Sequence, residues 1–203
     1  LGELTNIYET IAVSGTHGKS TTTAMIGLLL ARAGLNPTVI VGTKVKEFGN
    51  SNFRMGGYPN LGCCKTVLQQ PLKTKNYLVI EADEHFASFL NYWPKILVLT
   101  TVEADHLDYW KTLKNLLKGF QEYATHVPKN GTLVANKDDK NIQKLLKTMR
   151  STNGTAAPNV LQFSLQQKEA SVVRKILKVP GEHNVSNALA ALAVARILGV
   201  KDA

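Results

Sequence analysis

The chain has 203 residues, of which 44% are hydrophobic, and a formal net charge of +9. This length and composition favour one α/β domain with a sizeable core over two small domains. No apolar run reaches the roughly eighteen residues that a membrane-spanning helix needs, and Leu1–Thr10 lack the basic start and apolar middle of a signal peptide. We therefore expect a cytoplasmic protein without a membrane partner.

The basic residues are spread along the chain and are not regularly interleaved with aromatic residues. This distribution predicts solvated helix surface that attracts small anionic molecules, and we expect no nucleic-acid partner. Cys63 and Cys64 are adjacent, and neighbouring cysteines rarely form a disulfide with each other. They predict reduced thiols, as in a cytoplasmic protein, and not a zinc site.

Six short, mostly continuous runs of β-branched and aliphatic residues predict strands covered on both faces, as in a parallel sheet. These runs are residues 11–14, 38–41, 77–82, 96–102, 132–135 and 160–164. Apolar stripes at helical spacing predict four helices, within Ile26–Ala33, Leu113–Ala124, Ile142–Met149 and Val185–Ala195. The alternation predicts a doubly wound, mostly parallel α/β sheet with helices on both faces and ligands at the carboxyl ends of the strands. Residues 42–71 predict a long irregular segment, and residues 153–158 a turn.

A strand, a glycine-containing turn and a helix follow one another in residues 11–23, with the sequence IAVSGTHGKSTTT. Backbone N–H groups in such a turn and at the helix N-terminus bind phosphate, and the helix dipole favours the negative charge. We expect Lys19 to bind the β- and γ-phosphates and Ser20 to bind Mg²⁺, in a fold like that of P-loop NTPases. The expected ATP-binding residues of this loop are Gly15, Thr16, His17, Gly18, Lys19, Ser20 and Thr21. Val13 replaces the first glycine of the general pattern, so the alternative is an ordinary turn with an incidental lysine.

Acidic residues lie at the carboxyl ends of two of the predicted strands. Glu81 is expected to hold Mg²⁺, because hard cations prefer carboxylate oxygens, whereas Asp83 and Glu84 are expected to cap the next segment or to support the metal ligands. The alternative for this group is a polar strand terminus. At the end of the next strand, His106 lies among the carboxylates of Glu103, Asp105 and Asp108, and this group is expected to complete a second metal position. A histidine in isolation is more often structural, and only its place at the ligand edge favours a metal role.

Asn184 and Asn187 are three residues apart at the start of the last predicted helix and therefore share one helical face. Amide side chains offer a donor and an acceptor together, which matches the edge of an adenine ring. The alternative is that Asn184 alone caps the helix.

Five ordered segments together resemble the central ATPase domain of the Mur ligase family, which also includes folylpolyglutamate synthase. They are GTHGKSTTT at 15–23, EADE at 81–84, EADHLD at 103–108, NKDD at 136–139 and GEHNVSNA at 181–188. The resemblance implies an ATP-dependent, ADP-forming amide ligase of peptidoglycan synthesis, with ATP and Mg²⁺ as cofactors. The motifs look most like those of the member that joins L-alanine to UDP-N-acetylmuramate through an acyl phosphate. The alternative is the member that reattaches recycled murein tripeptide to UDP-N-acetylmuramate.

The resemblance also implies roles for individual residues by matching position. It assigns catalysis to Lys19, Glu81 and His106, one Mg²⁺ to Ser20 and Glu81, and a second Mg²⁺ to Glu81 and His106. Gln121 stands where some members carry a carbamylated lysine, so no carbamate is expected.

The residues implied for the two larger ligands come from two further segments. The adenine end of ATP would face His183, Asn184 and Asn187. The UDP-sugar would approach Asn50, Asn52 and Arg54.

Residues 1–203 are expected to form a single central ATP-binding domain, with the family's N-terminal UDP-sugar domain and C-terminal amino-acid domain outside this chain. On that basis the chain alone should bind ATP weakly at most and should not ligate. Two other classes stay open: a nucleotide-binding module without ligase chemistry, and a basic protein that binds nucleic acid in a salt-sensitive manner.

Overall fold

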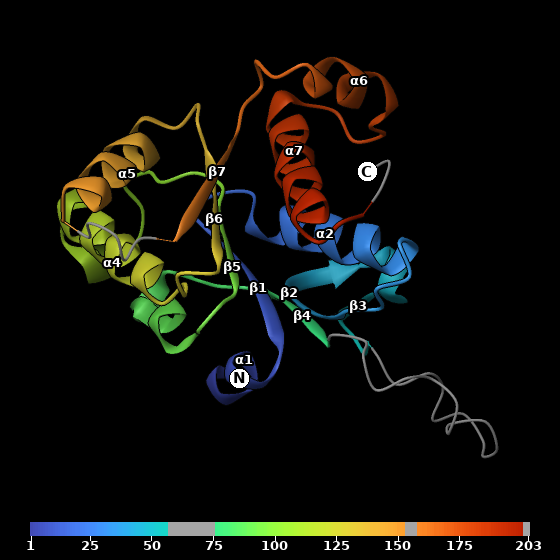
Figure 1. Cartoon of the computed structure of the whole chain (residues 1–203), viewed down its shortest axis with the longest axis horizontal. Helices are drawn as coiled ribbons and strands as arrows, with labels where there is room; N and C mark the ends of the chain where they lie inside the picture. The colour runs from blue at the N-terminus through green and yellow to red at the C-terminus, as the bar shows by residue number, and fades with distance from the viewer. Residues whose placement is uncertain (57–75, 153–157, 201–203) are drawn as a thin grey trace.

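The computed structural model describes residues 1–56, 76–152 and 158–200. A seven-stranded sheet in the order β3-β2-β4-β1-β5-β6-β7 separates two layers of helices (Figure 1). The strands are β1 (Glu9–Ser14), β2 (Thr38–Val45), β3 (Ser51–Arg54), β4 (Tyr77–Glu81), β5 (Ile96–Leu99), β6 (Thr132–Asn136) and β7 (Asn159–Phe163). All neighbouring strands are parallel except β2 and β3. The doubly wound, mostly parallel α/β sheet predicted from the sequence is confirmed.

The helical layers follow the alternation of side chains along each strand. The longer helices are α2 (Lys19–Arg32), α4 (Leu113–Thr125), α5 (Lys140–Thr152) and α7 (Glu182–Ile197), and all four were predicted. On β4, Val79 packs into the cluster that contains residues of α2 and α7. Its neighbours Leu78 and Ile80 pack into the cluster that contains residues of α4 and α5. Such alternation is expected when a strand is buried on both faces.

Five shorter helical segments complete the described fold. They are α1 (Gly2–Ile7), η1 (Lys46–Phe48), η2 (His85–Asn91), α3 (Leu107–Trp110) and α6 (Glu169–Ile176). α6 packs beside α7, and η2 packs against α4. Among the described residues, no helix is both long enough and apolar enough to cross a bilayer.

The prediction of an irregular segment from residue 42 is wrong as far as residue 54. β2 continues to Val45, η1 reverses the chain, and β3 returns antiparallel as the edge strand. The outer positions of β3 are only partly buried and its two inner residues are exposed. Because a solvated edge strand buries few side chains, it carries no apolar run that would mark it in the sequence. The remainder of that segment, with Cys63 and Cys64, and most of the predicted turn at 153–158 lie outside the described residues.

The centre of the sheet is the point at which the winding changes direction. β1 lies between β4 and β5, so the chain builds one half of the sheet on one side of β1 and the other half on the other side. In open α/β sheets, ligands bind beyond the carboxyl ends of the strands at this switch point. The segment after β1 is therefore placed at the ligand edge.

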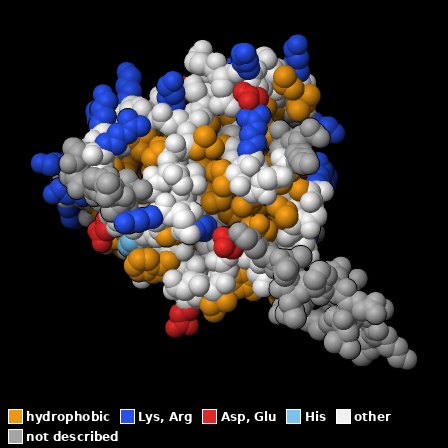
Figure 2. Space-filling model, viewed as in Figure 1, with side chains coloured by type: hydrophobic (Ala, Val, Ile, Leu, Met, Phe, Trp, Pro, Cys, Tyr) orange, Lys and Arg blue, Asp and Glu red, His pale blue; other side chains and the backbone are white. Residues whose placement is uncertain are grey.

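Lysine and arginine side chains lie over the left, upper and right parts of the face in Figure 2. This agrees with the sequence-based expectation that most of the positive charge is solvated surface.

Candidate functional site: a nucleotide loop with a buried ion pair

The loop between β1 and α2 is held in shape by the segment that follows β5. The N–H of Thr16 donates to the carbonyl of Thr101 at 2.8 Å, and the N–H of His17 donates to the Thr101 hydroxyl at 3.0 Å. The Thr100 hydroxyl donates to the carbonyl of His17 at 2.6 Å. Two of the N–H groups expected to face phosphate therefore brace the loop instead.

Phosphate-binding capacity remains at the start of α2. The first N–H groups of an α-helix have no intrahelical acceptor, and Gly18, the residue before α2, makes no side-chain cap. The N–H groups of Lys19, Ser20 and Thr21 are therefore free to bind an anion at the positive end of the helix dipole.

Gly18 is required by its backbone and by its neighbour. Its φ is +82°, and a Cβ at this position would lie 2.5 Å from the side-chain oxygen of Asn187 on α7. Asn187 is buried against the loop, and the side chain of Asn184 donates to the carbonyl of Pro180 at 2.6 Å. His183 is exposed beside Gly181. Asn187 thus packs on the phosphate loop, whereas His183 is open to solvent.

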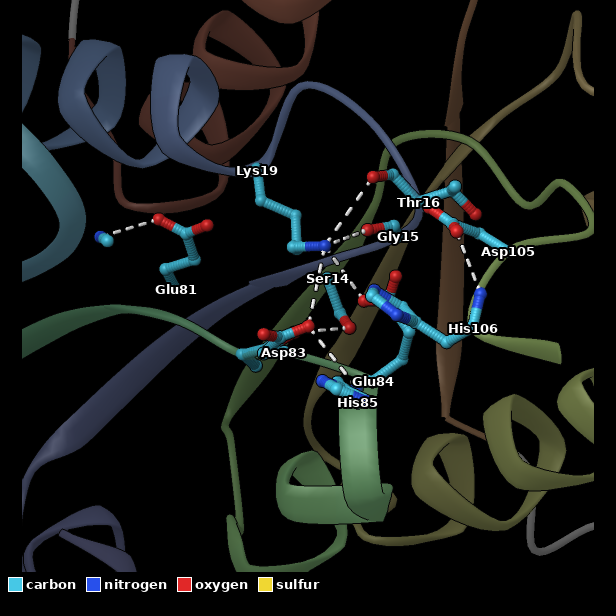
Figure 3. Close-up of polar contacts among 12 residues, drawn as sticks. Ser14, Gly15, Thr16, Lys19, Glu81, Asp83, Glu84, His85, Asp105 and His106 are labelled. Atoms are coloured by element: carbon cyan, nitrogen blue, oxygen red, sulfur yellow. Dashed lines mark hydrogen bonds and ion pairs between the residues drawn. The ribbon is translucent and has the colours of Figure 1, made fainter. Parts of the chain in front are cut away.

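The ammonium of Lys19 is turned toward its own loop and toward the residues after β4 (Figure 3). It donates to the carbonyl of Gly15 and to Oε2 of Glu84, each at 2.8 Å, and lies 3.5 Å from the carbonyl of Thr16. An ammonium has three N–H donors, so these three acceptors account for all of them. A phosphate that binds Lys19 has to replace at least one of them.

Glu84 is the least exposed carboxylate of the site. Its side chain is 0% exposed, and its Oε1 has no hydrogen-bond partner among the described residues. Burial raises the pKa of Glu84 above its ordinary value, although the hydrogen bond and charge of Lys19 oppose the shift. The sequence placed Glu84 only as a capping or supporting group, and its pairing with Lys19 could not be read from the spacing of the two residues.

Asp83 lies one residue before Glu84, the N-cap residue of η2, which has no side-chain cap bond. Its Oδ1 accepts the N–H of His85 at 3.2 Å and lies 3.6 Å from the Lys19 ammonium. Partial burial by itself would raise the pKa of Asp83, but the His85 N–H and the charge of Lys19 bring the pKa below its ordinary value. Asp83 therefore stays ionised and adds negative charge beside Lys19.

Ser20 and Glu81 meet on the other side of Lys19. The Ser20 hydroxyl donates to Oε1 of Glu81 at 3.0 Å, and the N–H of Gly42 donates to Oε2 at 2.7 Å. Two adjacent oxygen ligands of octahedral Mg²⁺ are about 3.0 Å apart when each metal–oxygen bond is about 2.1 Å. The oxygen donors of this pair therefore fit a shared Mg²⁺.

His106 lies beside a different set of carboxylates. One of its ring nitrogens lies within 4.8 Å of carboxylate oxygens of Asp83 and Glu84, and its ring stacks on that of His85 with centroids 4.2 Å apart. Its backbone is left-handed, with φ +49°, and its N–H donates to the side chain of Asp105. Figure 3 shows Glu81 and His106 on opposite sides of Lys19. Among the described residues, the two side chains predicted to share the second Mg²⁺ do not fall into one group of potential metal ligands, so that pairing is not supported.

The NKDD segment after β6 supports the site, although its residues were noted only as part of a motif. Asn136 donates to the carbonyl of Thr100 at 2.8 Å, and Oδ2 of Asp139 accepts the N–H of Val102 at 3.0 Å. Oδ1 of Asp139 also accepts the N–H of Ile142 and so caps α5. These bonds hold the segment that braces the phosphate loop.

The three residues predicted for the UDP-sugar lie at different places on the edge hairpin. Ser51 pairs with Val45 at the carboxyl end of β2, whereas Arg54 pairs with Val39 near its amino end. Asn50 is therefore near the ligand edge, and Arg54 is at the opposite edge of the sheet. The Arg54 guanidinium donates to the carbonyl of Pro37 and the side chain of Asn36, and Asn52 is exposed.

Comparison with known proteins agrees with this geometry. The family model described as the Mur ligase middle domain matches residues 13–195. The chain belongs to the Mur ligase middle-domain family. The matched range contains the phosphate loop, the residues after β4 and β5, and the start of α7.

Two relatives of this Mur ligase domain are UDP-N-acetylmuramate–L-alanine ligases. The one from Caldicellulosiruptor saccharolyticus is 39% identical over 224 residues, covering 98% of this chain and 44% of the relative. The one from Solibacter usitatus is 38% identical over 216 residues, covering 99% and 42%. The chain therefore spans less than half the length of these relatives.

A similar solved structure is the UDP-N-acetylmuramate:L-alanyl-γ-D-glutamyl-meso-diaminopimelate ligase from Neisseria meningitides. It has a TM-score of 0.79 and 27% identity, and the match covers 98% of this chain and 65% of the solved chain. The match shows that this Mur ligase domain and the solved chain share a fold.

Proposed function

We propose that this Mur ligase domain binds ATP and Mg²⁺ and activates a carboxylate in the ligation of L-alanine to UDP-N-acetylmuramate. The observation that carries the proposal is the arrangement beyond β1, where the start of α2, the Lys19 ammonium and the Ser20–Glu81 pair converge. An anion-binding helix terminus, a point charge and a pair of metal ligands are the parts that phosphoryl transfer needs.

The triphosphate would lie over the start of α2. In this arrangement the N–H groups of Lys19–Thr21 bind phosphate oxygens, and the Lys19 ammonium turns from Gly15 and Thr16 toward the β- and γ-phosphates. Ser20 and Glu81 would hold Mg²⁺, which neutralises phosphate charge when bound. His106 would contribute to a second metal position together with the carboxylates of Asp83 and Glu84, whose donor atoms lie near its ring, in place of Glu81.

The chemistry would proceed in two displacements. A carboxylate oxygen of UDP-N-acetylmuramate attacks the γ-phosphorus, and ADP leaves with the electrons of the broken P–O bond. The amine of L-alanine then attacks the acyl carbon of the acyl phosphate and expels phosphate. Because the protein supplies no covalent intermediate, catalysis rests on positioning and on charge stabilisation by Lys19 and the metal ligands.

The remaining ligand contacts are also part of the proposal. His183 and Asn184 are available for the adenine end of ATP, whereas Asn187 contributes by packing on Gly18. Asn50 is the best placed of the three residues predicted for the UDP-sugar, since Arg54 is engaged at the opposite edge. We also propose that the UDP-sugar and the amino acid bind mainly to domains outside these 203 residues. The need for ATP supports a cytoplasmic location.

The test uses a protein in which this chain is the middle of the three domains of the family. Phosphate release from ATP should require both UDP-N-acetylmuramate and L-alanine. Release that ignores L-alanine but requires a murein tripeptide would assign the chain to the recycling reaction instead. ATP binding without release under any combination of these substrates would favour a nucleotide-binding module.

A further inference from the structure

Two histidines and a carboxylate gather beside the nucleotide loop. His85 follows β4, His106 follows β5, and Asp108 lies in α3. One donor atom from each lies within 4.8 Å of the others. The side chains come from two separate segments of the chain, so the cluster depends on the fold and not on local sequence.

His85 and Asp108 have few competing partners, whereas the His106 ring also lies near the carboxylates of Asp83 and Glu84. Nε2 of His85 is buried and makes no hydrogen bond with any described residue, and the carboxylate of Asp108 lies 3.7 Å from it. The Lys111 ammonium bonds to the main-chain carbonyl of Asp108. Among the bonds described, the Asp108 carboxylate is thus directed to His85.

The backbone around the cluster is held in an unusual conformation. Phe86, Ala87 and His106 all have φ values near +50°. Left-handed backbone at a residue other than glycine costs free energy and is concentrated at binding and catalytic sites. The Phe86 ring stacks on His85 with centroids 4.0 Å apart.

The donor set differs in chemistry from the Ser20–Glu81 pair. Hydroxyl and carboxylate oxygens suit Mg²⁺, whereas imidazole nitrogens suit zinc, iron, cobalt, nickel and copper. Two imidazoles with one carboxylate also leave open coordination positions. We propose that, in the absence of nucleotide, His85, His106 and Asp108 form a binding site for a divalent transition-metal ion, typified by Zn²⁺, that is separate from the Ser20–Glu81 pair. This site shares His106 with the second metal position of the proposed function, so only one of the two is filled at a time.

Binding requires a small rearrangement of the rings. The two imidazoles stack nearly parallel, at 12°, whereas two ligands of tetrahedral zinc are about 3.3 Å apart and their rings converge on the ion. The χ2 torsion of histidine is broad, so each ring can turn toward the ion without leaving its χ1 well. The exposed Asp108 carboxylate can follow.

The proposal is tested with Zn²⁺ alone on the nucleotide-free 203-residue chain. The protein carries Cys63→Ser and Cys64→Ser, which remove thiolates that would bind zinc elsewhere. Competition with a chromophoric chelator should show one Zn²⁺ per chain. His85→Gln and Asp108→Asn should each weaken binding by about tenfold or more. Because the test contains no nucleotide, its outcome is independent of the proposed ligase function.

His126→Gln is the matched control, because His126 stacks on Trp93 and bonds to the carbonyl of Tyr92. It should retain the parent affinity. Co²⁺ should give ligand-field bands of nitrogen and oxygen ligands, and Zn²⁺ should shift the imidazole ¹⁵N resonances of His85 and His106 in the parent. Asp108 is exposed, so its variant is expected to fold even if His85→Gln does not. Absence of Zn²⁺ binding, parent-like affinity in Asp108→Asn, or equal loss in His126→Gln would overturn the proposal.

Discussion

The Lys19 ammonium and the fully buried Glu84 carboxylate form an ion pair at 2.8 Å across the nucleotide loop. Burying either charge without its partner would cost free energy, so each group stabilises the other in the folded domain. The lysine expected to bind phosphate therefore also stabilises the fold of the nucleotide-free domain.

Lys19→Ala is expected to lower the free energy of unfolding as well as nucleotide affinity. Removing one member of a buried ion pair costs about 3–5 kcal/mol. The double variant Lys19→Ala/Glu84→Gln should recover most of this loss, because it removes the unpaired charge. Urea unfolding at neutral pH measures both variants. If Lys19→Ala has the same free energy of unfolding as the parent, the buried Glu84 carboxylate does not require Lys19 for stability.

The stability of the parent should depend on the protonation of Glu84. The folded-state pKa of Glu84 is raised above its ordinary value of 4.5, chiefly by burial. A group whose pKa is higher in the folded state adds to the free energy of unfolding at low pH. This addition is complete below the unfolded-state pKa and is lost as the pH rises through the folded-state pKa. Glu84→Gln should lack this loss, whereas Glu122→Gln, at an exposed position, should retain it. Unfolding curves measured over a pH series would refute the assignment if both variants follow the parent.

Gly18→Ala should destabilise the domain through both its backbone and its contact with Asn187. Left-handed backbone at alanine costs about 1–2 kcal/mol, and the contact of the new Cβ with Asn187 adds to it. Gly34→Ala is a matched control, because Gly34 has φ +79° and nothing within 4 Å of its Cβ position. The difference between the two variants in thermal or urea unfolding measures the steric part. Equal losses of unfolding free energy in the two variants would mean that the Asn187 side chain moves away from the new Cβ at no cost.

Glu81→Gln should raise the Mg²⁺ concentration needed for ATP binding by about tenfold or more, because an amide oxygen is a weaker ligand than a carboxylate. Titration of Mg²⁺ at fixed ATP measures the shift, with Glu122→Gln as the control for loss of one negative charge. An unchanged Mg²⁺ requirement would remove Glu81 from the proposed metal site.

Much of the architecture follows from the sequence because it depends on apolar periodicity. The buried strands and the four long helices each carry enough apolar side chains to be recognised, and the loop after β1 is marked by Gly18, Lys19 and Ser20. The phosphate-loop pattern did not predict that Thr101 occupies the N–H groups of Thr16 and His17. That pairing joins residues more than eighty positions apart along the chain.

The features that could not be predicted from the sequence are those set by the exposure or burial of a residue in the folded chain. β3 is an exposed edge strand without an apolar run, and Glu84 looks like any polar residue after a strand until the fold encloses it. The left-handed residues around His85 are equally hidden, since Phe86 and Ala87 are not typical of positive φ. Local composition carries no signal for these features.

The most direct test of the account is a crystal structure of the 203-residue chain with Mg²⁺ and a non-hydrolysable ATP analogue. We expect the β- and γ-phosphates over the N–H groups at the start of α2, the Lys19 ammonium bonded to phosphate, and Mg²⁺ held by Ser20 and Glu81. Phosphates bound elsewhere, or a Lys19 ammonium still donating to Gly15, Thr16 and Glu84 with no phosphate in reach, would contradict it.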